Sequence, residues 1–174
     1  MWCYSNCESV ELFLNGKSLG EKKFSDTKDL HLVWKVRYAA GTLKAIAKIG
    51  SRIVCTDEVA TAGPPAKIAL SPDRNEITAD GDDLSNIKIE IVDKDGRVCP
   101  NADNLVKFRI EGEGVIAGVG NGNPVSDDNF KGNERKAFHG LCLAVIQSER
   151  KGGTIHLSAE SEGLLPAEVL IQVE

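Results

Sequence analysis

The chain has 174 residues, a net charge of −5 and a pI of about 5.3. Its lysines and arginines are scattered singly, so it lacks the clustered positive surface that nucleic-acid binding requires. No apolar run approaches the ~20 residues needed to cross a bilayer, so neither nucleic acid nor a membrane is an expected partner.

The first clear structural signal is a hairpin near the N-terminus. The β-like runs Val10–Leu14 and Lys17–Phe24 flank Asn15-Gly16. This dipeptide predicts a type I′ turn, because that turn needs positive φ at both central residues. The two-residue period of a strand leaves Phe13 on the outer face and places three aliphatic residues on the core face. These three are Val10, Leu12 and Leu14.

Three aromatic residues are candidates for an interface. Trp2 and Tyr4 share one face of a short strand predicted at Trp2–Ser5, and Phe13 faces away from its own core. Exposed aromatic side chains commonly anchor protein contacts. Two alternatives stay open: a cross-strand neighbour covers Phe13, or Trp2 and Tyr4 form a platform on which a sugar stacks.

The rest of the N-terminal part also has strand periodicity. Leu30–Tyr38 alternates cleanly and predicts a strand whose apolar face includes Trp34, which we interpret as a core residue. Thr42–Ile49 and Arg52–Thr61 predict a second hairpin, around Gly50-Ser51. The predicted apolar face of the alternating strand consists of Leu30, Leu32, Trp34, Val36 and Tyr38.

A stiff joint divides the chain at Ala62-Gly63-Pro64-Pro65. Two adjacent prolines fix two φ angles and remove two backbone donors, so no central strand can pass through them. We therefore predict a small β domain at residues 1–62, a joint at 62–65 and a larger domain at 66–174.

The second part continues with short strands and turns. About seven strands at this spacing are typical of an immunoglobulin-like Greek-key sandwich, and no helical period occurs. The predicted fold class is therefore all-β, with two tandem immunoglobulin-like β-sandwich domains. The expected strands and inward sets are Ile68 with Leu70, Ile87 with Ile89 and Ile91, Val106 with Phe108 and Ile110, Val115–Ala117, Ala137–Gln147, Thr154–Ala159 and Glu168–Val173.

No segment of the sequence predicts a catalytic, metal-binding or phosphate-binding site. Asp93-Lys94-Asp95-Gly96 is typical of a turn and lacks the later ligands of a calcium loop. Asp80–Asp83 is an acidic loop at which a weak calcium site stays open as an alternative. The glycines of Gly112–Gly122 precede no helix that would cradle a phosphate. Carboxylates fall in turns and on outer strand faces, where we expect ordinary surface acids.

The five cysteines do not match a zinc pattern, and we expect all of them to be reduced. Most of them lie in apolar segments that are predicted to be strands, where a free cysteine packs as a small hydrophobic residue. We predict no catalytic, cofactor-binding or metal-binding residue in this chain.

One resemblance covers nearly the whole chain. Val10–Gly20, Leu32–Val36 and Gly41–Ala45 resemble the accessory sandwich domain that follows the catalytic barrel in bacterial β-galactosidases of glycoside hydrolase family 2. Motifs of the second part are similar to the immunoglobulin-like domain at the far C-terminus of the same enzymes. These motifs are Ala79-Asp80-Gly81, Val92–Gly96, Gly118–Pro124 and Ala137–Gly140.

The resemblance implies a non-catalytic C-terminal region of a longer glycosidase that hydrolyses terminal β-galactosides. It implies that the first strand of the small domain precedes Trp2, and that the region supports the catalytic barrel or mediates assembly with another subunit. Both catalytic glutamates of the family lie on the barrel, so none is carried over to this chain. The resemblance also implies a periplasmic or extracellular location.

Two other functions remain alternatives at this point. A segment of immunoglobulin-like repeats from a bacterial surface adhesin shares the looser motifs of the second part. A carbohydrate-binding module would use the aromatic residues Trp2 and Tyr4.

Overall fold

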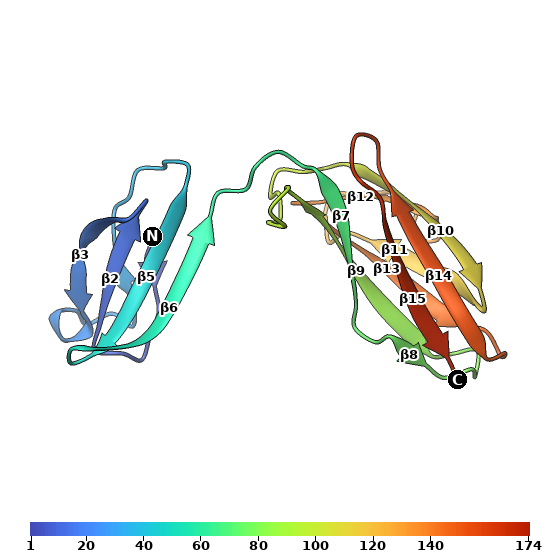
Figure 1. Ribbon diagram of the computed structural model, residues 1–174, viewed down its shortest axis with the longest axis horizontal. Helices are drawn as coiled ribbons and strands as arrows, with labels where there is room; N and C mark the ends of the chain where they lie inside the picture. Colours follow the sequence, from blue (N-terminus) through green and yellow to red (C-terminus); the bar gives the residue numbers. More distant parts are fainter. The chain divides into compact units, whose positions relative to one another are not determined.

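The computed structural model describes residues 1–174, and every regular element is a strand except one three-residue 3-10 turn (Figure 1). The all-β prediction is therefore confirmed. The chain forms two compact units, Met1–Thr61 and Ala62–Glu174, which are described separately below.

Unit 1 is a four-stranded antiparallel sheet in the order β3-β2-β5-β6, with a small pair of strands, β1 and β4, contributing to its core. The predicted hairpin is confirmed, since Asn15 (φ 51°) and Gly16 (φ 78°) connect β2 to β3. The elements are β1 (Trp2–Cys3), β2 (Ser9–Leu14), β3 (Lys17–Lys23), the 3-10 turn η1 (Phe24–Asp26), β4 (Leu32–Val33), β5 (Thr42–Ile49) and β6 (Arg52–Ala60).

The core of unit 1 gathers on one face of this sheet. Val10 and Leu12 on β2 pack with Leu32, Trp34 and Ala47. Trp34 is only 4% exposed, and its indole N–H donates to the carbonyl of Gly20 over 3.2 Å. The prediction of a core tryptophan is confirmed.

The long strand predicted at Leu30–Tyr38 is wrong. Only Leu32–Val33 forms a strand, because only the two residues of β1 lie beside it to complete a ladder. The alternation is correct in the middle, where Leu32 and Trp34 are buried. It fails at both ends, since Leu30 is 88% exposed and Tyr38 is 85% exposed.

Unit 2 consists of two sheets, β12-β10-β14-β15-β8 and β11-β13-β9-β7, that share one hydrophobic core (Figure 1). All pairings are antiparallel except β15 with β8. The strands are β7 (Lys67–Pro72), β8 (Glu76–Ile77), β9 (Leu84–Val92), β10 (Leu105–Gly112), β11 (Gly114–Gly120), β12 (Glu134–Lys136), β13 (Leu141–Ser148), β14 (Gly153–Glu160) and β15 (Ala167–Val173).

The core of unit 2 follows the predicted two-residue period. Ile87, Ile89 and Ile91 on β9 are fully buried, and they pack in one cluster with Val106 and Phe108 of the other sheet. Strands of both sheets therefore turn alternate apolar residues toward a shared interior, as in a β-sandwich.

Three predictions for unit 2 are corrected. Ala137–Gln147 is not one strand, because His139 (φ 53°) and Gly140 (φ 79°) form a tight turn after which β13 begins. Gly114–Gly120 forms a seven-residue strand rather than a brief pairing, with a bulge at Ile116/Gly118. Two short strands, β8 and β12, were not expected from the sequence.

Candidate functional site

The predicted interface residues Trp2 and Tyr4 lie in an exposed aromatic cluster of unit 1. Both side chains project from the N-terminal segment, and His31 lies between them. The imidazole is stacked on the Trp2 ring with centroids 4.8 Å apart, and it is 5.4 Å from the Tyr4 ring. The sequence did not point to His31, because the contact depends on the pairing of β1 with β4.

Phe13 does not join this cluster. It is half-buried on β2, opposite Ser18 and Lys44, on the face of the sheet that lies away from Val10 and Leu12. The structure therefore places the three predicted interface residues at two separate sites of unit 1.

The edge strand β6 is the least covered element of unit 1. Its residues Arg52–Val59 are all exposed, including Ile53, Val54 and Val59. Cys55, Asp57 and Val59 are paired with Ala47, Ala45 and Leu43, so they share the face that carries the core. One flank of the core face therefore lacks a covering layer within this chain.

The burial of Asp93 contradicts the expectation of ordinary surface acids. Asp93 follows β9 directly and is buried in unit 2. Its carboxylate accepts the backbone N–H groups of Gly63 over 2.8 Å and of Asp95 and Arg97 over 2.9 Å each. These hydrogen bonds lower the pKa of Asp93, and the bond from Gly63 has the largest effect. The D-x-D-G sequence indicates the turn, but the bond to Gly63 comes from the tertiary fold.

The acidic loop at Asp80–Asp83 uses its oxygens internally. Asp80 accepts the N–H groups of Asp82 and Asp83 over 2.8 Å. Asp83 accepts those of Thr78 and Leu84, which lower its pKa to about 2. No group of three or more His, Cys, Asp or Glu residues is arranged to hold a metal ion.

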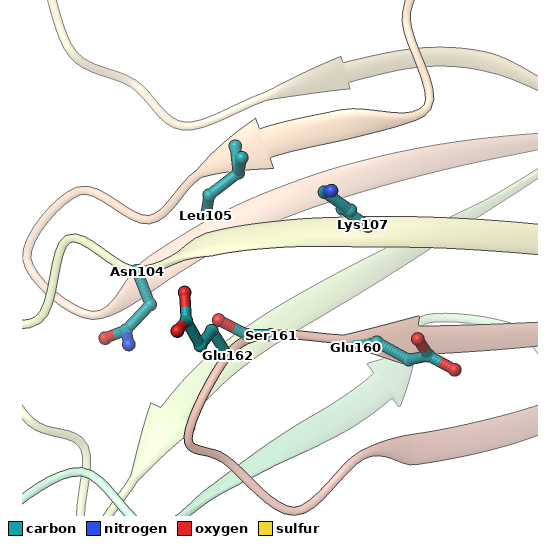
Figure 2. A pocket seen from close by; sticks show the side chains of 6 residues that line it. All are labelled: Asn104, Leu105, Lys107, Glu160, Ser161 and Glu162. Carbon is teal, nitrogen blue, oxygen red and sulfur yellow. The ribbon is translucent and has the colours of Figure 1, made fainter.

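A surface depression of about 580 Å³ lies beside β10 and the end of β14 (Figure 2). Figure 2 shows the carboxyl group of Glu162 near Asn104, whereas that of Glu160 points away from it. Glycoside hydrolysis needs two carboxylates that face one substrate across about 5–9 Å in a site that excludes water. The depression has no such converging pair. Its lining residues are Asn104, Leu105, Lys107, Glu160, Ser161 and Glu162.

The five cysteines are free. Cys99 and Cys142 are buried, and burial raises the pKa of Cys142 to about 12, which disfavours the reactive thiolate. Cys55 is exposed, so the expectation of a packed thiol is wrong for this residue.

A buried arginine that sequence analysis missed holds the loop 121–133 of unit 2. Arg135 on β12 is 2% exposed and forms no ion pair. Its guanidinium donates to the carbonyl of Asp128 over 3.1 Å and to Oδ1 of Asn121 over 3.2 Å. It also lies 4.8 Å from the ring centroid of Phe130, while its Nε has no partner.

The helix-free architecture leaves no helix long and apolar enough to span a membrane.

Comparison with known protein families matches both units. The model described as "Glycoside hydrolase family 2 C-terminal domain 5" matches residues 68–170, and "Domain of unknown function (DUF4982)" matches residues 1–55. The first of these matches covers more than half of the chain.

Relatives match over nearly the whole chain. It is 51% identical to beta-galactosidase BoGH2A of Bacteroides ovatus, covering 100% of this chain and 20% of that protein. It is 30% identical to a beta-glucuronidase of Formosa agariphila, covering 99% of this chain and 18% of that protein. The crystal structure of a glycosyl hydrolase family 2 member from Bacteroides cellulosilyticus superposes with a TM-score of 0.94 at 46% identity, covering 98% of this chain and 22% of that chain. The chain thus spans about a fifth of the length of the proteins it matches.

Proposed function

Because this chain belongs to glycoside hydrolase family 2, as part of its C-terminal region, we propose that it supports the catalytic barrel of a β-galactosidase without taking part in the chemistry. The observation that carries this proposal is the match of the whole chain to about one fifth of much longer glycosidases. The family identity favours this function over adhesin repeats.

The substrate follows from the relatives. The relative with 51% identity is named a beta-galactosidase, whereas the named beta-glucuronidase is 30% identical. We therefore propose that the full-length protein cleaves terminal β-galactosides. Hydrolysis of nitrophenyl β-galactoside and nitrophenyl β-glucuronide by the full-length protein tests this choice, and a preference for the glucuronide would reverse it.

The small domain is proposed to be completed by a preceding strand. The support is the core-side flank of β6, where Cys55 and Val59 remain exposed. A strand beside β1 would cover this flank and remove apolar surface from water. Trp2, Tyr4 and Phe13 are proposed as contacts of unit 1 with the barrel or with another subunit.

The direct test separates support from chemistry. The 174-residue chain should give no turnover of a nitrophenyl β-galactoside, because its carboxylates do not converge in a closed site. Removing it from the full-length protein should lower the thermal midpoint or change the assembly. Turnover by the chain alone that disappears on mutating a single Asp or Glu would contradict the proposal.

A further inference from the structure

The loop 121–133 displays two apolar side chains in an otherwise polar segment. It crosses from β11 in one sheet of unit 2 to β12 in the other. Val125 is 86% exposed and Phe130 is 60% exposed. Ordered loops of this length are uncommon in compact domains and are often functional.

The loop is held in one shape by its own side chains. The Oδ1 atoms of Asn121, Asn123 and Asn129 each accept a backbone N–H two residues later. Lys131 donates to the carbonyl of Ala117 over 2.8 Å, which ties the far side of the loop to β11. A loop fixed before binding loses little conformational entropy when it meets a partner.

Arg135 provides an independent argument that the loop shape matters. Burying a cation without a counter-charge is more costly than burying an apolar side chain of similar volume. Both hydrogen bonds of the guanidinium, and its contact with the Phe130 ring, go to the loop. Arg135 is thus a positioning residue for the loop.

We propose that the loop 121–133 is a docking element that inserts Val125 and Phe130 into an apolar pocket on the catalytic domain of the full-length protein. This inference rests on the proposed function for the identity of the partner. Asp127 and Asp128 form no ion pair within this chain, so basic side chains on the partner surface would complement the charge of the loop. About four fifths of the length of the matched relatives lies outside this chain and supplies the partner surface.

The test is hydrogen exchange in the full-length protein. The double variant Val125→Ser/Phe130→Ser should speed amide exchange in the loop and in one segment outside this chain by about tenfold or more, because the contact protects both sides. Leu165→Ser is the matched control, since Leu165 is equally apolar and exposed in unit 2, and it should change neither segment.

Arg135→Met tests the positioning role separately. It should speed exchange in the loop and in the same outside segment while the amides of β9 and β13 stay protected. General loss of protection in β9 and β13 would show that the guanidinium is needed by the core, and would overturn the positioning role.

Two outcomes would overturn the docking proposal. One is unchanged exchange outside this chain in the double variant of a protein that is an active glycosidase, in which case the proposed function stands and the docking fails. The other is a loop that becomes protected only when lactose is added, which would make it a glycan site. A full-length protein without glycosidase activity would instead refute the proposed function.

Discussion

Units 1 and 2 are built from the same kind of strand, but they differ in how well each covers its own core. The buried core of unit 1 contains five hydrophobic residues, whereas that of unit 2 contains nineteen. The second layer of unit 1 is β1 with β4, two residues each, while unit 2 has sheets of four and five strands. Unit 2 therefore has the layered core of an independent domain.

The comparison shows how little margin unit 1 has. Small domains bury a smaller fraction of their surface, so their stability depends on a few residues. In unit 1 these residues surround Trp34, and the flank at β6 stays open. We expect unit 1 to unfold first and unit 2 to remain folded, and three substitutions test this difference.

The largest expected effect is that of Trp34→Ala. Replacing a buried aromatic residue with alanine costs about 3–5 kcal/mol, which is comparable to the whole free energy of unfolding expected for a domain of this size. Unit 1 should lose its protected amides while those of unit 2 stay unchanged. Exchange monitored by NMR would resolve the two units.

Trp2→Ala is the control for that experiment, because Trp2 is exposed and lies outside the core of unit 1. A loss of less than about 1 kcal/mol for Trp34→Ala would show that unit 1 does not depend on its tryptophan. Simultaneous unfolding of both units would show that they are not independent.

A smaller effect is expected for Gly16→Ala in the hairpin of unit 1. Gly16 has φ +78°, and no atom lies within 4 Å of the place that a Cβ would take. Alanine at this position therefore costs only the strain of a left-handed backbone. That cost is about 1–2 kcal/mol. Gly120→Ala in unit 2 is matched, since its surroundings are equally open and its φ is ordinary. Urea denaturation should reveal a loss for Gly16→Ala alone, and equal losses would refute the backbone explanation.

The smallest expected effect is a pH dependence confined to unit 2. Asp83 has a folded pKa of about 2 against an ordinary value of 3.8, because backbone N–H groups favour its ionised form. The stabilisation that Asp83 gives to the folded state is complete above its pKa in the unfolded chain. It is lost as the pH falls through its pKa in the folded chain. Asp83→Asn should therefore reduce the drop in unit 2 stability between about pH 4 and pH 2.

Asp127→Asn provides the control, because the Asp127 side chain makes no hydrogen bond or ion pair. Urea midpoints measured across the pH range should fall in parallel for this variant and the unaltered chain. A parallel fall for Asp83→Asn as well would refute the assigned role.

Features that depend on local pattern were predictable from the sequence. The turn at Asn15-Gly16 follows from backbone preference, and the buried faces of β9 and β10 follow from strict alternation. Leu30–Tyr38 shows where this reasoning ends. Alternation describes which face a side chain takes, but a strand also needs a neighbour, and only Leu32–Val33 has one.

Polar residues inside the fold could not be predicted in the same way. The sequences around Asp93 and Arg135 are typical of turns and surface strands, yet both side chains are buried. Their burial depends on distant partners, Gly63 for the carboxylate and Asn121 for the guanidinium. Trp2 and Tyr4 could be proposed as interface residues from the sequence, because both are aromatic and share one face of a predicted strand. The docking role of the loop 121–133 could be inferred only from the structure.

The hydrogen bond between Gly63 and Asp93 affects where a protease can cleave this chain. The N–H of Thr61 is bonded to Gly41 in unit 1, and the N–H of Gly63 is bonded to Asp93 in unit 2. Only the N–H of Ala62 lies between these two anchors, and Pro64 and Pro65 follow directly. Cleavage needs an accessible segment that can leave its hydrogen bonds. Limited proteolysis should therefore cut first at exposed turns within the units, so that the two units resist separation by a protease even though each folds around its own core.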